Sequence, residues 1–175
     1  AGAQAGGDNC SRWKAVARMI VGQFNGTPGG GGGTWSFKLD DPKHILNQAF
    51  KGVGFWHKDE IYQYKPETYV GVDKLRVLVS LDLNKGHTMK PLNRNEGLKK
   101  QYTEGGRTVP VSWIRTFEGG RVFYTNLGHN ASTYWSPAVL QHYLDGLQYA
   151  LGDLTADATP SSKITREEVL APPAP

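Results

Sequence analysis

Residues 119–130 read GGRVFYTNLGHN, and this stretch decides the fold prediction. Its glycines form a tight turn, and the apolar run that follows, from Arg121 to Leu127, predicts a buried strand. Gly128, His129 and Asn130 then begin a polar loop directly after the strand. Ligands bind at the carboxyl ends of the strands in open α/β sheets. His129 and Asn130 are therefore candidates for chemistry.

Elements on both sides of this stretch are readable from the sequence. Residues 109–117 form a second apolar run, and Glu118 with the two glycines joins the runs as a β-hairpin. Ser136 and Pro137 begin a helix that Gly152 ends. One face of this helix carries its large apolar side chains, and we expect that face to be buried. These side chains are Leu140, Tyr143, Leu144, Leu147 and Leu151.

The upstream part alternates between helical and extended patterns. A helical apolar face predicts a helix from about residue 11 to 24, and a short helix follows Pro42. Strands are predicted over residues 34–39, 60–64 and 75–83. The last run is almost continuous in Leu and Val, which is typical of a strand covered on both faces. The alternation predicts an α/β protein with a largely parallel sheet and an antiparallel edge.

Composition limits the partners of the chain. The 175 residues suit one domain, and the single cysteine, Cys10, excludes an internal disulfide. The net charge is +4, but the basic residues are scattered, which argues against nucleic acid as a partner. No apolar run approaches the length of a membrane span, so none is predicted. These features fit a cytoplasmic protein and equally a periplasmic or exported one, so the location stays open.

Three segments together resemble the ThuA-like (trehalose-utilisation) domain, a branch of the class I glutamine-amidotransferase-like fold. They are HKDEIY at 57–62, PVSWIR at 110–115 and GRVFYTNLGH at 120–129. The resemblance implies a flavodoxin-like three-layer sandwich with a mostly parallel sheet and an antiparallel hairpin. It also implies that residues 1–153 are the C-terminal part of such a domain, with N-terminal units missing. Residues 154–175 are then an extended proline-rich tail.

The resemblance further implies a protein of carbohydrate catabolism that binds or processes a sugar or keto-sugar at the C-terminal edge of the sheet. As an enzyme it would be a hydrolase or an isomerase. The alternative is a non-catalytic binding or assembly module, in an oligomer or a larger multi-chain complex. Glutamine amidotransferase activity is disfavoured, because Gln4 occupies the expected place of the nucleophile and Cys10 lies off it.

The candidate catalytic residues are His129, Asp59 and Glu60. His129 would act as acid or base, because imidazole titrates near neutral pH. Adjacent residues of an extended segment point to opposite sides, so we expect only one carboxylate to face the cleft. The alternatives are a loop histidine that caps backbone groups and a solvated charge pair with Lys58. His57 could join Asp59 and His129 around a divalent metal such as zinc, provided that the three converge. No other cofactor is expected.

The candidate substrate-binding residues surround the same predicted edge. Asp8 and Asn9 precede the first helix and could bind a polyol or simply cap that helix. Asn130 adjoins His129, and the aromatic residues Tyr62, Tyr134 and Trp135 could stack on a sugar ring or belong to the core. The glycines at 29–33 are either a connector or a loop lining the cleft. The remaining histidines, His44, His87 and His142, show no partner pattern and are expected on the surface.

Overall fold

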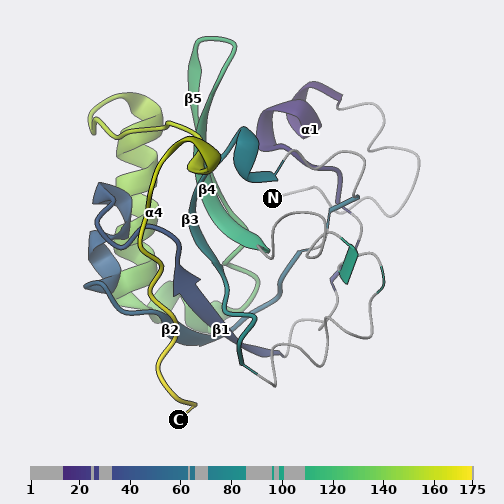
Figure 1. Cartoon of the computed structure of the whole chain (residues 1–175), viewed down its shortest axis with the longest axis vertical. Helices are drawn as coiled ribbons and strands as arrows, with labels where there is room; N and C mark the ends of the chain where they lie inside the picture. Colours follow the sequence, from purple (N-terminus) through teal and green to yellow (C-terminus); the bar gives the residue numbers. More distant parts are fainter. Residues whose placement is uncertain are drawn as a thin grey trace.

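A five-stranded sheet organises the molecule (Figure 1). The computed structural model describes residues 14–24, 26–27, 33–62, 64–65, 71–85, 96, 99–100 and 109–174. In this part of the chain the strand order is β2-β1-β3-β4-β5. Their bounds are Thr34–Leu39 for β1, Phe55–Lys58 for β2, Arg76–Leu81 for β3, Pro110–Phe117 for β4 and Gly120–Thr125 for β5.

Every pairing within this sheet is antiparallel. The prediction of a flavodoxin-like sandwich with a mostly parallel sheet is therefore wrong. Parallel neighbours need a long crossover that carries a helix over the face of the sheet. Between β1 and β2 the chain instead makes the short 3-10 helix η3 (Ile45–Phe50) and returns beside β1. The continuous apolar run of β3 reflects cover on both faces and not parallel pairing.

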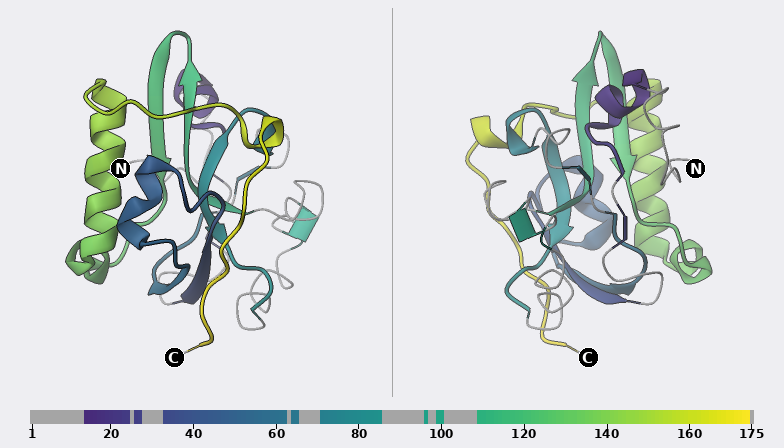
Figure 2. Two further views of the ribbon diagram at one scale, coloured as in Figure 1. Left: turned by 60° about the vertical axis from the view of Figure 1, so that its left-hand side comes forward. Right: turned by 90° about the vertical axis from the view of Figure 1, so that its right-hand side faces the viewer.

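Two apolar clusters provide that cover. The larger cluster lies between the sheet, η3 and the helix α4 (Pro137–Leu151), and includes Phe37, Leu78 and Val139. The smaller cluster lies on the other side and includes Val21, which follows α1 (Lys14–Ile20), and Trp113. Figure 2 shows α4 and α1 on different sides of the strands. Three further 3-10 segments are η5 (Gly71–Asp73), η6 (Ala131–Trp135) and η7 (Ser161–Lys163).

Local patterns predicted several elements correctly. The β4–β5 hairpin is confirmed, and Glu118 and Gly119 both have positive φ, at 49° and 80°, as a two-residue hairpin turn requires. Helix α4 is confirmed, and Gly152 ends it with a φ of 101°. No helix in the described part of the chain is long and apolar enough to cross a lipid bilayer.

Two predicted elements differ from the structure. The strand expected at residues 60–64 lies instead at Phe55–Lys58, and Tyr64 forms only an isolated bridge with Phe24. The helix expected to reach residue 24 ends at Ile20, because Val21 adopts a φ of 70°. Residues 11–13 of that prediction lie outside the described residues.

Helix α4 faces the opposite way from the prediction. Its residues Val139, His142, Gly146 and Tyr149 are buried, whereas Leu140, Leu144, Leu147 and Leu151 are exposed. Gly146 accounts for this, because a Cβ at that position would lie 2.3 Å from the ring of Phe123 on β5. Only glycine lets the helix approach the sheet so closely on that side, and the leucines consequently point outward.

His142 fixes the same side of the helix by hydrogen bonds. Its ring is fully buried, with Nδ1 2.6 Å from the carbonyl oxygen of Leu46 and Nε2 2.8 Å from Oγ of Ser112. Burial lowers the pKa of His142 to about 4. The prediction that His142 lies on the surface is wrong. Its hydrogen-bond partners, Leu46 and Ser112, are distant in the sequence and could not be recognised from it.

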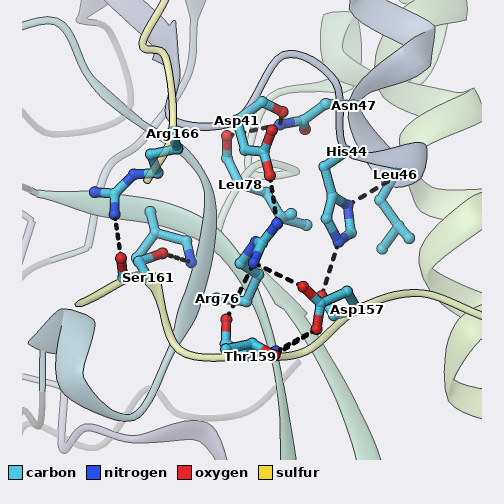
Figure 3. Close-up of polar contacts among 11 residues, drawn as sticks. Asp41, His44, Leu46, Asn47, Arg76, Leu78, Asp157, Thr159, Ser161 and Arg166 are labelled. Atoms are coloured by element: carbon cyan, nitrogen blue, oxygen red, sulfur yellow. Dashed lines mark hydrogen bonds and ion pairs between the residues drawn. The ribbon is translucent and has the colours of Figure 1, made fainter. Parts of the chain in front are cut away.

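His44 is also buried, although it too was predicted on the surface. Its Nδ1 accepts a hydrogen bond from the backbone N–H of Leu46, so Nε2 donates to the carbonyl of Asp157 at 3.0 Å (Figure 3). Burial lowers the pKa of His44. The third histidine, His87, lies outside the described residues.

The segment after α4 is extended and is held to the sheet by side-chain contacts (Figures 2 and 3). Arg76 of β3 is buried and bonds Asp41 at 2.5 Å and Asp157 at 3.1 Å. Farther along, Val169 forms two backbone hydrogen bonds with Leu39 of β1, each 2.9 Å long. The segment is therefore tied to the sheet both by side chains and by one isolated antiparallel bridge to β1.

We expect Gly146→Ala to lower the free energy of unfolding by up to about 2 kcal/mol. The clash with Phe123 costs about 1–3 kcal/mol, which exceeds the gain in helix propensity of about 1 kcal/mol. Urea denaturation followed by circular dichroism measures the effect. Gln141→Ala on the exposed face is the control. In a Phe123→Ala background the alanine should no longer destabilise, and a persisting cost would contradict the packing argument.

We expect acid to destabilise the protein through His142. The folded pKa lies below the ordinary value of 6.5, so protons favour the unfolded chain, and stability is lost as the pH falls from 6.5 to about 4. The loss from this residue is on the order of 3 kcal/mol. Urea unfolding at pH 7 and pH 4.5 measures it, with His142→Gln as the non-titrating control. Equal pH dependence of both proteins would contradict the assignment.

Candidate functional site

Asp59 connects the two opposite edges of the sheet. It follows β2, at one edge, and its carboxylate reaches the loop after β5, at the other edge. Its own backbone is held as well, since its N–H donates to Gly33 at 3.1 Å and its carbonyl accepts from Trp35 Nε1 at 3.0 Å. The side chain is completely buried.

The carboxylate of Asp59 accepts hydrogen bonds from five donors. Oδ1 accepts from three backbone N–H groups, those of Glu60 at 2.9 Å, His129 at 3.0 Å and Asn130 at 3.0 Å. Oδ2 accepts from the backbone N–H of Gly128 at 2.7 Å and from the hydroxyl of Thr133 at 2.9 Å. Both oxygens are thus saturated with donors. Both oxygens act as acceptors in every one of these bonds, which leaves Asp59 no lone pair for proton transfer. Its visible role is to fix the loop.

Glu60 and His129 form a more accessible pair. His129 Nδ1 lies 3.2 Å from Glu60 Oε2, and the two side chains are 47% and 15% exposed. Asp59 and Glu60 therefore hold the same residue in two ways, one through its backbone N–H and the other through its ring. With Nδ1–H donating to Glu60, Nε2 of the neutral ring carries the lone pair, as a general base requires.

His57 connects to Asp59 through a hydroxyl. The Thr133 hydroxyl donates to Asp59, so the 2.8 Å contact between His57 Nε2 and Thr133 Oγ1 has the imidazole as donor. Burial lowers the pKa of His57, although the charge of Asp59 opposes this. The ring is consequently a neutral donor that supports the loop.

The predicted metal ligands His57, Asp59 and His129 do not form a ligand set. Asp59 is saturated by N–H and O–H donors, His57 directs Nε2 to Thr133, and the His129 ring turns to Glu60. Within the described ranges, no group of three His, Cys, Asp or Glu side chains could hold a metal ion.

Gly128 shapes the loop between two tyrosines. Its φ is 129°, and a Cβ there would lie 2.9 Å from the hydroxyl of Tyr143 and 3.0 Å from that of Tyr134. Tyr143 donates to the carbonyl of Leu127 at 2.6 Å, and Tyr134 donates to the carbonyl of Gly128 at 3.0 Å. Both hydroxyls thus hold the backbone that presents His129.

The other predicted binding residues have different surroundings. Tyr62 is half-buried against Phe24, and burial together with the nearby Glu60 raises its pKa, so its hydroxyl stays protonated. Asn130 uses its amide to bond the carbonyl of Lys58 at 3.0 Å. Trp135, at the end of η6, is 83% exposed. Asp8 and Asn9 lie outside the described residues, as do Gln4, Cys10 and residues 29–32.

Two residues whose hydroxyls hold the loop, Thr133 and Tyr143, were not predicted from the sequence. Thr133 is a lone hydroxyl in a polar stretch, and no local pattern distinguishes it. Tyr143 was assigned to the apolar face of the helix because of its spacing. Its position beside Gly128 depends on the way α4 is turned, which only the packed structure shows.

We expect Asp59→Asn to lower the free energy of unfolding by about 3 kcal/mol, because the amide replaces an acceptor oxygen by a donor that faces N–H groups. Urea denaturation followed by tryptophan fluorescence measures this. Asp153→Asn, at an exposed carboxylate just after α4, is the matched control and should change stability by less than about 0.5 kcal/mol. Similar values for the two variants would refute the role of Asp59.

Comparison with known proteins places the chain in a family. The family model for ThuA, described as trehalose utilisation, matches residues 1–150. No curated protein and no solved structure gives a significant match. The matched region contains Gly128 and His129 of the loop described above and also Asp59 and Glu60, which contact that loop. The chain belongs to the ThuA (trehalose utilisation) family.

Proposed function

We propose that this chain binds a sugar or keto-sugar at the loop after β5 and that His129 acts there as acid or base. The observation that carries the proposal is the Glu60–His129 pair, which is partly exposed on a loop fixed by a buried carboxylate. The His129 ring is partly exposed and uses Nδ1 to contact Glu60, so its Nε2 is available to a ligand. The trehalose-utilisation family supports a carbohydrate as that ligand.

Glu60 gives His129 the orientation that proton transfer requires. By accepting from Nδ1–H, the carboxylate fixes the tautomer and stabilises the imidazolium formed when Nε2 takes a proton. The same base can activate a water molecule in a hydrolysis or remove a proton next to a carbonyl in an isomerisation. The pair fits both reaction classes.

Aromatic side chains near the loop suit a sugar ring. Tyr134 is half exposed, and its hydroxyl bond to Gly128 keeps the ring beside the loop. Trp135 follows it in the chain and, among the residues that the structure describes, is the most exposed of the large apolar side chains. Sugars stack their C–H faces on such rings while their hydroxyls bond polar neighbours.

A non-catalytic binding module is the second candidate. The observation that favours it is the saturation of Asp59, which removes one predicted catalytic carboxylate from the chemistry. Ligand binding without turnover needs only the Glu60–His129 pair and the neighbouring aromatic rings. Turnover of a bound sugar by the wild-type protein distinguishes the two candidates.

We expect His129→Ala to abolish sugar processing or to weaken sugar binding by about 100-fold or more, because it removes the imidazole whose Nε2 would take the proton and contact the ligand. Glu60→Gln should reduce turnover by about tenfold and preserve most of the binding. Calorimetric titration and product analysis with trehalose, glucose and fructose measure both.

Gln141→Ala, at an exposed position of α4, is the control for this series, and unchanged unfolding midpoints show that each variant is folded. Wild-type activity in His129→Ala would reject the assignment of the base. Binding without turnover by the wild-type protein would favour the module. Failure of the wild-type protein to bind any of the three sugars would reject the carbohydrate site.

A further inference from the structure

The outward face of α4 carries a row of four exposed leucines. Their exposed fractions are 42%, 48%, 59% and 78% in chain order. We call Leu140, Leu144, Leu147 and Leu151 the leucine row. Successive members are separated by four, three and four residues, which is the spacing of the apolar seam in paired helices. A solvent-facing helix surface ordinarily carries charged and polar side chains instead.

The helix cannot turn this row inward. On its opposite side Gly146 leaves no room for a Cβ beside Phe123, and His142 is bonded at both ring nitrogens. Rotation would break these two hydrogen bonds and drive a larger side chain into the sheet. The exposure of the leucine row is thus built into the packing of the helix.

The residues beside the row permit contact with an identical helix. The acidic and basic residues of α4 are His142, which is buried against the sheet, and Asp145, which accepts a hydrogen bond from Gln141 at 2.7 Å. Gln141 and Gln148 adjoin the row and are uncharged. Two copies brought together along this face would therefore meet without like-charge repulsion at the seam.

The spacing itself favours a second copy of this chain. The separations in the leucine row are four, three and four whether they are counted from the N-terminus or from the C-terminus of the helix. An identical helix packed antiparallel and in register therefore places a leucine opposite each leucine of the row. We propose that two copies associate through α4 about a twofold axis, with Leu144 opposite Leu147 of the partner subunit and Leu140 opposite Leu151 of the partner subunit. Antiparallel packing also pairs opposite ends of the helix dipoles.

The contact area sets the strength of this dimer. Fifteen residues span about 22 Å of helix, and one such helix supplies only part of the roughly 800 Å² per partner of a standard interface. We therefore expect a dissociation constant in the micromolar range. The association depends on α4 and is independent of the Glu60–His129 pair, so the two proposals can fail separately.

Sedimentation equilibrium of the 175-residue chain over about 1–200 μM tests the proposal. The wild-type chain should change from monomer to dimer in this range, and Leu144→Glu with Leu147→Glu should remain monomeric. Leu170→Glu is the matched control, because Leu170 is 43% exposed in the C-terminal segment, and it should dimerise like the wild type. A monomeric wild type, or a dimer that survives the double substitution, overturns the proposal.

Disulfide trapping tests the antiparallel arrangement and does not depend on the glutamate variants. In a Cys10→Ser background, chains with Leu140→Cys are mixed with chains carrying Leu151→Cys and oxidised mildly. Antiparallel packing predicts crosslinks between the two kinds of chain and few within either kind. Crosslinks mainly within each kind indicate parallel packing and overturn the arrangement, and the absence of any crosslink overturns the interface.

Discussion

The buried carboxylate of Asp59 is the interaction on which the site depends. It follows β2 at one edge of the sheet and accepts hydrogen bonds from the loop after β5 at the other edge. The chain segments that it joins are about seventy residues apart in the sequence. A buried carboxyl group is tolerated in this position because both of its oxygens accept hydrogen bonds. The exposed Glu60–His129 pair is a product of that fixed geometry.

The turning of α4 is a second constraint with effects on both sides of the helix. Gly146 and His142 bind it to the sheet and η3, and Tyr143 thereby reaches the backbone beside Gly128. The same orientation leaves the leucine row in solvent. The orientation of α4 thus supports the His129 loop on the inner side of the helix and leaves an apolar surface on its outer side.

Much of the fold was predictable where the evidence is local. The β4–β5 hairpin follows from two adjacent glycines, and the end of α4 follows from Gly152. The direction of the strands was not predictable in this way, because an apolar run has the same pattern in parallel and antiparallel sheets. The facing of α4 was mispredicted for a related reason. Leucine spacing identifies a face, but a glycine and a histidine determined which face is buried.

The site was predictable in its residues more than in their roles. Sequence alone pointed to Asp59, Glu60 and His129, and the structure places them within one hydrogen-bonded cluster. The sequence could not show that the carboxylate of Asp59 is fully hydrogen-bonded to backbone N–H groups, because most of those groups belong to a turn whose conformation depends on Gly128. Thr133 and Tyr143 gave no local sign of their contacts. The functional roles of the cluster remain those proposed above.

The location of Asp59 has a consequence for how the molecule responds to stress. It follows β2, a four-residue edge strand, and short edge strands open at lower cost than central ones. Fraying of that strand would withdraw the carboxylate and release the His129 loop while β3 and β4 stay paired. The geometry of the His129 loop and the folded core would then be lost at different temperatures, and a ligand bound at that loop, as proposed above, would protect the amide hydrogens of β2 from exchange.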